Sequence, residues 1–307
     1  MISLRTPKPL SLVTGAAGFI GSNLVDYLLE QGHQVVCVDN ESANNDKFYW
    51  NKDTYNVSGD ITDYKTMKNA FTNVDYVFHL AAESRLQPAI ENPIGAVEKN
   101  CVGTTVMLQC AREAGVKRFV YSSTSSAYGN NPYPNIETQP DDCLNPYSAS
   151  KAAGEKFCKM YTDLYGLETV VLRYFNVFGD RSPTRGQYAP VIGIFQRQKD
   201  AGQALTIVGD GSQRRDFVHV KDVARANYMA ATSPLLYHDQ IDNHLGEVFN
   251  VGSGTCYTIQ QIANAISLNQ TYIPERKGEM DTTFADITKI EKVIGWKPEI
   301  DVLDWLK

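Results

Sequence analysis

The sequence predicts an α/β fold, a doubly wound parallel sheet with a smaller, partly discontinuous C-terminal lobe. Two observations support this fold class. Through the first half of the 307 residues, short apolar runs rich in Val, Phe and Tyr alternate with longer amphipathic stretches, and this order implies parallel strands with helices on both faces. After Gly179 the alternation weakens, and residues 180–216 are rich in Gly, Arg and Gln. A second part of different construction is therefore expected.

The predicted strands are apolar runs of the length typical of buried parallel strands, and the stretches between them have helical spacing. The last predicted helix follows Asn145-Pro146, a helix-start signal. The predicted strands are residues 10–15, 34–40, 74–82, 117–124 and 167–179, with a further strand before Asp60. The predicted helices are residues 20–31, 63–71, 94–114 and 148–165. We assign residues 1–176 and 216–250 to the larger domain and residues 177–215 and 251–307 to the smaller lobe.

Charge and cysteine content exclude several classes of function. The chain has 29 Lys and Arg against 35 Asp and Glu, a formal net charge of −6, which argues against a large nucleic-acid-binding surface. No apolar run approaches the roughly 18–20 residues that span a bilayer, and the N-terminus lacks the apolar core of a signal peptide. The six cysteines show neither CxxC nor metal-ligand spacing. We therefore expect a cytoplasmic protein without metal, membrane or nucleic-acid partners.

A glycine-rich turn after the first predicted strand indicates a dinucleotide site. Gly15, Gly18 and Gly21 have GxxGxxG spacing between a strand and a helix. Glycine lets the backbone approach a diphosphate, and the helix N-terminus offers free N–H groups and a positive dipole end. Asp39 ends the second strand, 18 residues after Gly21. Its carboxylate can accept hydrogen bonds from the adenosine ribose and would repel a 2′-phosphate, so the pattern favours NAD over NADP.

Other residues at the ends of the predicted strands are expected to border the cofactor. Asp60 and Ile61 follow the third strand. Asp60 either reaches the adenine edge or caps the next helix, and both interpretations are open. The remaining cofactor candidates are Phe19, Ile20, Asn40, Leu80, Ala81 and Ala82.

Two Tyr-x-x-x-Lys pairs occur, Tyr64/Lys68 and Tyr147/Lys151. This spacing puts both side chains on one helix face, but chance alone gives about one such pair in a chain of this composition. Context favours the second pair, which follows the helix-start signal and lies 23 residues after Thr124. Thr124 stands at the C-terminal end of a strand, where ligands bind in open α/β sheets. We interpret the first pair, on a polar helix, as a solvated face.

Thr, Tyr and Lys together suit the oxidation of an alcohol. A lysine ammonium beside a tyrosine hydroxyl favours the phenolate and lowers a pKa that starts near 10. The tyrosine can then take a proton from the alcohol while a hydride leaves for a nicotinamide. A threonine hydroxyl at the same oxygen orients the alcohol. The catalytic candidates are Thr124, Tyr147 and Lys151, and the Tyr and Lys are also expected to contact the cofactor.

These motifs belong to six longer segments, GAAGFIGSNL, HLAAES, YSSTSSAYG, NPYSASK, LRYFNVFG and RRDFVHVKDV. In this order they resemble the extended short-chain dehydrogenase/reductase family, in particular its nucleotide-sugar epimerases, from about residue 12 to residue 298. The resemblance implies a Rossmann-type fold, a tightly held NAD, a UDP-sugar bound by the smaller lobe, and a homodimer built from helices 94–114 and 148–165. Helix 94–114 is apolar on more than one face, so its own domain or a partner subunit covers it.

Departures from other branches of the family narrow the reaction. The related 4,6-dehydratases carry Thr-Asp-Glu where this chain has Thr124-Ser125-Ser126, so the two carboxyl groups that eliminate water are missing. Cys143 does not stand where a 3,5-epimerase needs its cysteine. The resemblance therefore implies a 4-epimerase that acts through a 4-keto sugar. Asp39, at the end of the second strand, argues against a reductase that consumes NADPH. The retained Tyr-Lys pair argues against a non-catalytic NAD-binding regulator.

The resemblance also implies contacts to the nucleotide sugar. Asn176, Arg215 and Arg276 match residues that bind the diphosphate, and Glu279 matches one that holds the ribose. Arg85, after HLAAES, is expected to reach the sugar or a phosphate. Arginine suits phosphate because its planar fork can bind two oxygens at once.

The identity of the sugar stays open. Thr283 aligns with the position at which a bulky aromatic residue closes the pocket of narrow hexose epimerases. A smaller side chain leaves room for a 2-acetamido group, so both the UDP-GlcNAc/UDP-GalNAc and the UDP-Glc/UDP-Gal pairs are expected. GQYAPVI (186–192) resembles the nucleotide-binding loop of the acetamido-sugar members. Uronate epimerases also carry Thr near this position, which keeps UDP-glucuronate as an alternative.

Overall fold

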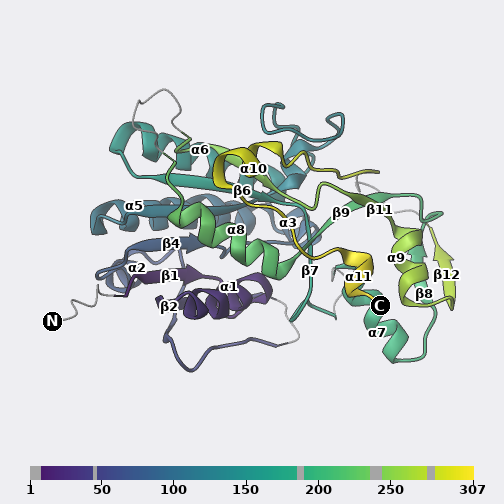
Figure 1. Cartoon of the computed structure of the whole chain (residues 1–307). Coiled ribbons are helices and arrows are strands. Elements are labelled where there is room, and N and C mark those ends of the chain that lie inside the picture. The colour runs from purple at the N-terminus through teal and green to yellow at the C-terminus, as the bar shows by residue number, and fades with distance from the viewer. Residues whose placement is uncertain (1–7, 44–46, 185–189, 236–243, 275–280) are drawn as a thin grey trace, which may run out of the picture.

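The computed structural model describes residues 8–43, 47–184, 190–235, 244–274 and 281–307 (Figure 1). Seven strands form one sheet in the order β10-β6-β5-β4-β1-β2-β3, and every neighbouring pair in it is parallel. The strands are β1 (Leu10–Thr14), β2 (Gln34–Asp39), β3 (Tyr55–Ser58), β4 (Tyr76–His79), β5 (Arg118–Thr124), β6 (Thr169–Tyr174) and β10 (Val248–Val251). The chain winds outward from β1 in both directions, which confirms the predicted doubly wound sheet.

Helices cover both faces of this sheet and form two cores. One face carries α1 (Phe19–Glu30), α8 (Val220–Thr232) and α10 (Thr288–Ile294), and the other carries α2 (Tyr64–Ala70), α5 (Thr104–Ala114) and α6 (Pro146–Tyr165). Neighbouring residues of a strand point to opposite faces, so Val13 belongs to the first core and Leu12 to the second. Burial on both faces explains why these strands occur in the sequence as continuous apolar runs.

The stretch 94–114, predicted as one helix, is divided in the structure. It consists of α4 (Pro93–Val97), a π-helical segment (Glu98–Gly103) and α5, and a short α3 (Leu86–Glu91) precedes it. Hydrogen bonds of a π-helix run over five residues instead of four, and apolar spacing does not reveal this change. A Cβ on Gly103 would lie 2.6 Å from the Ile61 side chain. The π-helical segment therefore packs closely against the residues that follow β3.

Residues 167–179, predicted as one strand, form two. β6 ends at Tyr174, and after Phe175 the chain continues as β7 (Asn176–Phe178). β7 pairs with β9 (Arg214–His219) and not with the main sheet, and β11 (Cys256–Thr258) completes a three-stranded sheet. Phe175 is thus the point at which the chain leaves the larger sheet for the smaller lobe.

The C-terminal lobe has a core of its own. β8 (Leu205–Val208) pairs with β12 (Gln270–Ile273), and α7 (Val191–Asp200), α9 (Ile259–Ile266) and α11 (Val302–Trp305) contribute to the same core. Its buried residues come from 178–217 and 259–302. The predicted boundary at residue 216 falls within β9, where Phe217 packs in the lobe core and Val218 in a core of the main sheet. The exact division of the chain into domains stays a prediction.

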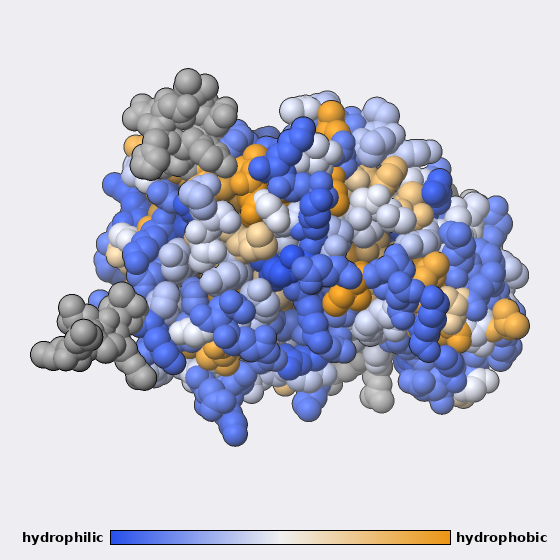
Figure 2. Space-filling view, viewed as in Figure 1, coloured by the Kyte–Doolittle hydropathy of each residue, from blue (hydrophilic) through white to orange (hydrophobic). Residues whose placement is uncertain are grey.

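Figure 2 shows one face of the molecule, on which hydrophilic side chains predominate and hydrophobic ones form small separate groups. Within the described ranges, no helix is long and apolar enough to cross a membrane. The same residues contain no group of three or more His, Cys, Asp or Glu side chains that could hold a metal ion.

Candidate active site

The glycine-rich turn lies between β1 and α1 and packs tightly against its neighbours. Gly15 has a φ of +67°, a conformation that favours glycine, and a Cβ there would lie 3.0 Å from the backbone nitrogen of Ala81. A Cβ on Gly21 would lie 2.0 Å from the carbonyl oxygen of Gly15. The first turn of α1 carries no acidic side chain. Its free N–H groups and positive dipole end are therefore available to a diphosphate.

Asp39 ends β2 beside this turn. Its side chain is buried, and its two oxygens accept hydrogen bonds from the backbone N–H groups of Ala17 (3.0 Å) and Glu41 (2.8 Å). Burial raises the pKa of Asp39, and the backbone hydrogen bonds oppose this rise. Each carboxylate oxygen can accept more than one hydrogen bond, so Asp39 can hold the turn and still accept from ribose hydroxyls. Sequence reasoning found only the second role.

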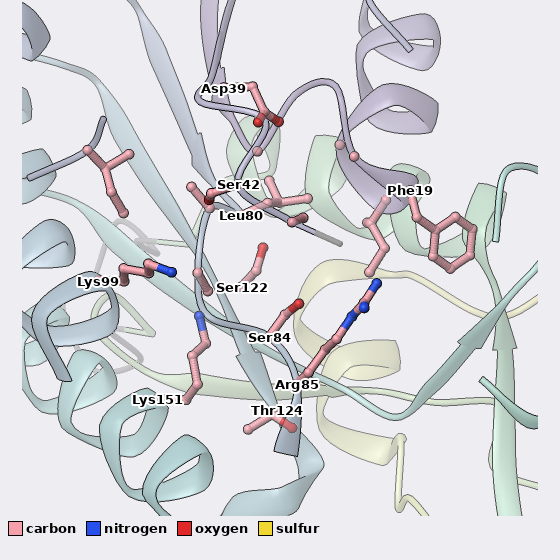
Figure 3. Close-up of a pocket in the computed structure, with 18 of the residues that line it drawn as sticks. Phe19, Asp39, Ser42, Leu80, Ser84, Arg85, Lys99, Ser122, Thr124 and Lys151 are labelled. Atoms are coloured by element: carbon pink, nitrogen blue, oxygen red, sulfur yellow. The ribbon is translucent and has the colours of Figure 1, made fainter. Parts of the chain in front are cut away.

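A cavity of about 350 Å³ lies at the C-terminal ends of the central strands (Figure 3). Its lining includes every residue predicted for the cofactor, namely Gly15, Gly18, Phe19, Ile20, Gly21, Asp39, Asn40, Asp60, Ile61, Leu80, Ala81, Ala82, Tyr147 and Lys151. The glycine turn, the carboxylate after β2 and the Tyr-Lys pair together fit an adenine dinucleotide with a redox-active ring. The contact that each residue makes stays a prediction.

Asp60 had two open interpretations, and the structure separates them. The N-cap of α2 is Asp63, whose side chain accepts hydrogen bonds from two backbone N–H groups of the first turn. Asp60 instead accepts hydrogen bonds from the backbone and hydroxyl of Thr62 and from the Asn40 amide (2.8 Å), and it lines the cavity. The interpretation of Asp60 as a helix cap is wrong.

The start of α6 fixes the positions of Tyr147 and Lys151. Asn145 is the N-cap, and its side chain accepts a hydrogen bond from the Ser148 N–H while the Ser148 side chain accepts from the Asn145 backbone. This capping box, with Pro146 as the first helical residue, sets where the helix begins. It thereby places the two candidate side chains in the first two turns, next to the end of β5.

Thr124, at the end of β5, meets this pair. Its hydroxyl hydrogen-bonds the Tyr147 phenol and lowers the pKa of Tyr147, but burial is the larger influence and raises that pKa. Lys151 is 3% exposed, and its ammonium lies 4.3 Å from the ring centre of Tyr121. Burial lowers the pKa of Lys151 to about 8. The net shift of the Tyr147 pKa is upward, opposite to the predicted shift, because desolvation of the phenolate outweighs the favourable contacts.

A second cavity of about 320 Å³ adjoins the first. The residues that line both are Ser84, Thr124, Tyr147, Tyr174 and Phe175. The second cavity is further lined by Leu86, Ser125, Ser126, Leu144, Asn145, Asn176 and Arg215. Hydroxyl and amide groups dominate this lining, which suits a polar ligand. The candidate catalytic hydroxyls thus stand where the two cavities meet.

Of the predicted substrate residues, Asn176 and Arg215 line the second cavity. Arg85 lines the first cavity and not the second. Figure 3 shows its side chain extending toward Phe19 at the start of α1. Arg85 therefore lines the same cavity as the glycine turn and is not part of the described lining of the hydroxyl-rich second cavity.

Thr283 lines neither cavity. It is 4% exposed, and its hydroxyl accepts a hydrogen bond from the Asn176 amide (2.9 Å). The structure therefore does not bring Thr283 to the border of either cavity, where its predicted role as a gate would place it. Arg276 and Glu279 lie outside the described residues, as does most of the loop 186–192.

Sequence reasoning missed several residues of the first cavity, among them Ser42, Ser84, Lys99, Ser122 and Phe175. Ser122 lies two residues before Thr124 in the same strand and shares its face, so strand alternation alone was a sufficient signal. Lys99 belongs to the π-helical segment, and its Nζ lies 3.4 Å from a carboxylate oxygen of Glu83. No local pattern marked Lys99, because its place depends on the irregular helix.

The other Tyr-x-x-x-Lys pair is a surface feature. The Tyr64 hydroxyl and the Lys68 ammonium both donate hydrogen bonds to Glu113, at 2.7 and 2.8 Å. Tyr64 is 38% exposed. The interpretation of this pair as a solvated face is confirmed.

Comparisons with known sequences agree with this site. A model of the NAD dependent epimerase/dehydratase family matches residues 11–252. The chain is 36% identical over 309 residues to the UDP-glucose 4-epimerase of Mycolicibacterium smegmatis, covering 94% of both proteins. It is 33% identical over 316 residues to the UDP-glucuronate 4-epimerase of Thermodesulfobacterium geofontis, covering 96% of this chain and 93% of that protein.

Solved structures give the same result. The UDP-glucose 4-epimerase of Thermotoga maritima with UDP-glucose has a TM-score of 0.89 at 35% identity, covering 97% of this chain and 96% of that one. The UDP-N-acetylglucosamine 4-epimerase of Methanobrevibacter ruminantium, in complex with UDP-N-acetylmuramic acid, has a TM-score of 0.89 at 32% identity and covers 98% and 96%. The Thermus thermophilus UDP-glucose 4-epimerase in complex with NAD has a TM-score of 0.85 at 31% identity and covers 97% and 96%. The resemblance found in the sequence is confirmed, and this chain belongs to the NAD-dependent epimerase/dehydratase family, with NAD as its cofactor.

Proposed function

We propose that the chain is a UDP-sugar 4-epimerase that inverts C4 through a transient 4-keto sugar. The observation that carries this proposal is the junction of the two cavities. Thr124 and Tyr147 line both the cavity with the glycine turn and the cavity rich in hydroxyl and amide groups. A hydroxyl group to be oxidised must stand at such a junction, with its acid–base partner in reach and the hydride acceptor beside it.

In the proposed reaction, Tyr147 removes the proton of the C4 hydroxyl while Thr124 orients that oxygen. NAD held in the first cavity would supply the acceptor, and afterwards the donor, of the C4 hydride. The Lys151 ammonium favours the phenolate form of Tyr147 electrostatically. After the keto sugar has presented its opposite face, Tyr147 returns the proton to the oxygen. The reaction involves no net oxidation, so a retained cofactor is sufficient.

Elimination of water is disfavoured at this site. Ser125 and Ser126, which stand where the dehydratases carry Asp and Glu, both line the second cavity. Among the described residues that line this cavity there is no carboxylate. A 4,6-dehydratase needs an acid and a base there, and the hydroxyl groups of serine do not supply them at neutral pH.

We assign the nucleotide diphosphate to Asn176, Arg215 and Arg276, and the ribose to Glu279. Arg215 supports this assignment best, because it is the described cation on the second cavity. For Arg85 the phosphate role is preferred over the sugar role, since its guanidinium extends toward the start of α1.

The sugar can belong to the glucose, N-acetylglucosamine or glucuronate series. UDP-glucuronate is the second candidate because a relative at 33% identity is a UDP-glucuronate 4-epimerase and because the hydroxyls of Thr124, Ser125 and Ser126 cluster on the second cavity. Such hydroxyls can donate to a carboxylate as well as to a neutral sugar.

The deciding experiment uses the purified protein without added cofactor. It is incubated separately with UDP-GlcNAc, UDP-glucose and UDP-glucuronate, and the anomeric NMR signals are followed. We expect the C4 epimer of one or more of these sugars, and the fastest reaction identifies the series. The Tyr147→Phe variant is the control for contaminating activity. A protein with bound NAD that converts none of the three sugars contradicts the proposal.

We also propose a homodimer formed through α4, the π-helical segment and α6. Met107 and Leu108 of α5 are buried in the domain, whereas Ile94, Val102 and Leu164 are exposed. For the apolar stretch 94–114, the sequence left open whether its own domain or a partner covers it. Its own domain covers it on one side. Its other side supplies the apolar surface that a second copy of the chain would bury.

A further inference from the structure

A buried carboxylate lies behind the candidate catalytic residues. Glu155 is 3% exposed and stands one helical turn after Lys151 on α6. One of its oxygens accepts hydrogen bonds from the Ser123 hydroxyl and from Nε of Arg173 (2.8 Å), and the other accepts from Nη2 of Arg173 (2.6 Å). Neither Glu155 nor Arg173 is part of the described lining of the two cavities.

This carboxylate joins the elements that carry the site. Ser123 immediately precedes Thr124 on β5, Glu155 follows Lys151 on α6, and Arg173 lies on β6. Displacing Glu155 would therefore change the distance between α6 and the end of β5. In the proposed reaction, side chains from both must contact the same substrate oxygen. Positions of catalytic groups matter at this scale, because an error of about 1 Å can cost 10²-fold in rate.

Stability alone does not explain the pair. Desolvation of two buried charges offsets most of their attraction, so a buried ion pair is a weak source of stability. Arg173 also pairs with Asp141 (2.6 Å), and its guanidinium carbon lies 4.5 Å from the ring centre of Tyr128, so several polar and charged groups are buried together here. Two apolar side chains of similar volume would fill this space without the desolvation cost of buried charges.

The charges around Lys151 single out Glu155. The groups facing the ammonium are Glu155 and Cys158 on α6, Cys101 on the π-helical segment, His79 at the end of β4 and the Tyr121 ring on β5. Burial lowers the pKa of His79 to about 3 and raises the pKa of both thiols, so these groups are neutral near pH 7. Among the described groups, Glu155 is therefore the negative charge that faces Lys151.

We propose that Glu155 is a positioning residue of this site, whose carboxylate keeps Lys151 charged and fixes α6 against the strand that ends at Thr124. The kinetic consequence rests on the proposed epimerase function. The electrostatic consequence does not, and it can be measured separately.

The test replaces the charge and keeps the size, with Glu155→Gln in the NAD-loaded protein. NMR of protein labelled with ¹³C at the lysine Cε follows the ionisation of Lys151, and Lys151→Met identifies its signal. Loss of a neighbouring negative charge makes the ammonium easier to deprotonate. We expect the midpoint of Lys151 to fall by about one pH unit, and the alkaline limb of kcat to move with it. At neutral pH kcat should fall roughly tenfold or more, with KM changed by less than about threefold.

Two further variants separate positioning from stability. Glu168→Gln is the matched control, because Glu168 pairs with Arg118 (2.6 Å) at the opposite ends of the same two strands. It should leave the Lys151 midpoint and kcat unchanged. The double variant Glu155→Gln/Arg173→Gln removes both charges of the pair, so it should recover thermal stability lost in the single variant. Its Lys151 midpoint should stay below that of the wild type, and its kcat should stay low.

A folded Glu155→Gln protein with the wild-type Lys151 midpoint and kcat overturns the inference. So does a double variant that regains both, because the ion pair would then be only a structural brace. If Glu155→Gln does not fold, the double variant decides the question. If the wild-type protein converts none of the UDP-sugars, the proposed function fails, and the Lys151 titration still decides the role of Glu155.

Discussion

Opposing influences act on Tyr147. Burial raises the pKa of its phenol and the charge of Glu83 adds to this, while the hydrogen bond from Thr124 lowers it. At neutral pH the phenol is therefore protonated, which suits the step that returns a proton to the sugar. For the step that removes a proton, the phenolate has to be favoured by nearby positive charge, and we assign this role to Lys151, one helical turn later on α6.

The first prediction concerns Tyr147. Tyr147→Phe keeps the ring that packs in the site and removes the hydroxyl, so turnover should fall at least about 100-fold while NAD stays bound. The measurement is epimer formation by NMR together with the NAD content of the purified protein. Full activity in this variant would show that another group is the base. Loss of NAD would instead show that the Tyr147 hydroxyl, and not the ring alone, holds the cofactor.

The second prediction concerns Asp39. Asp39→Asn keeps one oxygen for the glycine turn and removes the negative charge. We expect NAD to be retained roughly tenfold less tightly and NADP to be excluded less strongly, because a 2′-phosphate no longer meets a carboxylate. Calorimetry of the cofactor-free protein with each dinucleotide measures both. Asp53→Asn, at an exposed position of the following loop, is the control. Unchanged binding of both dinucleotides would remove Asp39 from the ribose site.

The sequence could predict a site residue where its role depends on a short pattern of neighbouring residues. Gly15, Asp39 and Tyr147 stand in short patterns whose spacing reflects one turn or one helix face. Thr283 depended on an alignment between distant segments, and the structure buries it against Asn176. The upward shift of the Tyr147 pKa needed the extent of burial, which a sequence pattern does not give.

At the scale of elements, apolar spacing predicted which faces are buried but not how each backbone is hydrogen-bonded. The strands on both sides of Phe175 contain buried apolar residues because two different sheets bury them, so the break between β6 and β7 is not evident from hydropathy. The π-helical segment buries Asn100 and Gly103, which are three residues apart, so its buried positions also have nearly helical spacing. Both errors arose where one pattern is compatible with two hydrogen-bonding schemes.

The third prediction concerns the contact between α6 and β5. An alanine is normally better than a glycine inside a helix by about 1 kcal/mol, but a Cβ on Gly154 would lie 2.2 Å from the Tyr121 hydroxyl, which is buried. Gly154→Ala should therefore lower the free energy of unfolding by about 1–3 kcal/mol. Tyr121→Phe removes the nearest atom only, because Cζ of the ring would still lie 2.5 Å from that Cβ, so the double variant Gly154→Ala/Tyr121→Phe should recover only part of this loss. Urea denaturation measures both, and a single variant as stable as the wild type would contradict the close packing.

At the scale of the whole molecule, the sheet topology gathers the site. The glycine turn, Asp39, Thr124 and Lys151 are far apart in the chain, but each ends a strand of the same parallel sheet, follows one, or lies near the start of the helix after it. Strand C-termini at one edge of a parallel sheet form a common crevice, so the sequence predicted this grouping. The sequence did not predict that β10 joins the sheet beside β6, because no regular alternation of strands and helices leads from β6 to β10.

The surface of α4 to α6 gives the last prediction its basis. Ile94 is 80% exposed and Leu164 is 66% exposed. α5 and α6 lie side by side, with the Tyr161 hydroxyl donating to the Gln109 side chain (3.2 Å) and the Arg112 guanidinium 4.0 Å from the Tyr165 ring centre. A large exposed apolar group is common when it is isolated, but several on adjoining helices are typical of an interface.

We therefore expect a dimer in sedimentation velocity, and we expect Ile94→Asp/Leu164→Asp to weaken dimerisation at least about tenfold, since burying an unpaired charge at an interface opposes association. Leu268→Asp is the matched control, because Leu268 is 85% exposed but follows α9 in the C-terminal lobe. It should leave the dimer intact. A dimer that tolerates the double variant, or that dissociates equally with Leu268→Asp, would place the interface elsewhere. Because α6 carries Tyr147, Lys151 and the exposed Leu164, dissociation is also expected to lower turnover by loosening the helix that holds the Tyr-Lys pair.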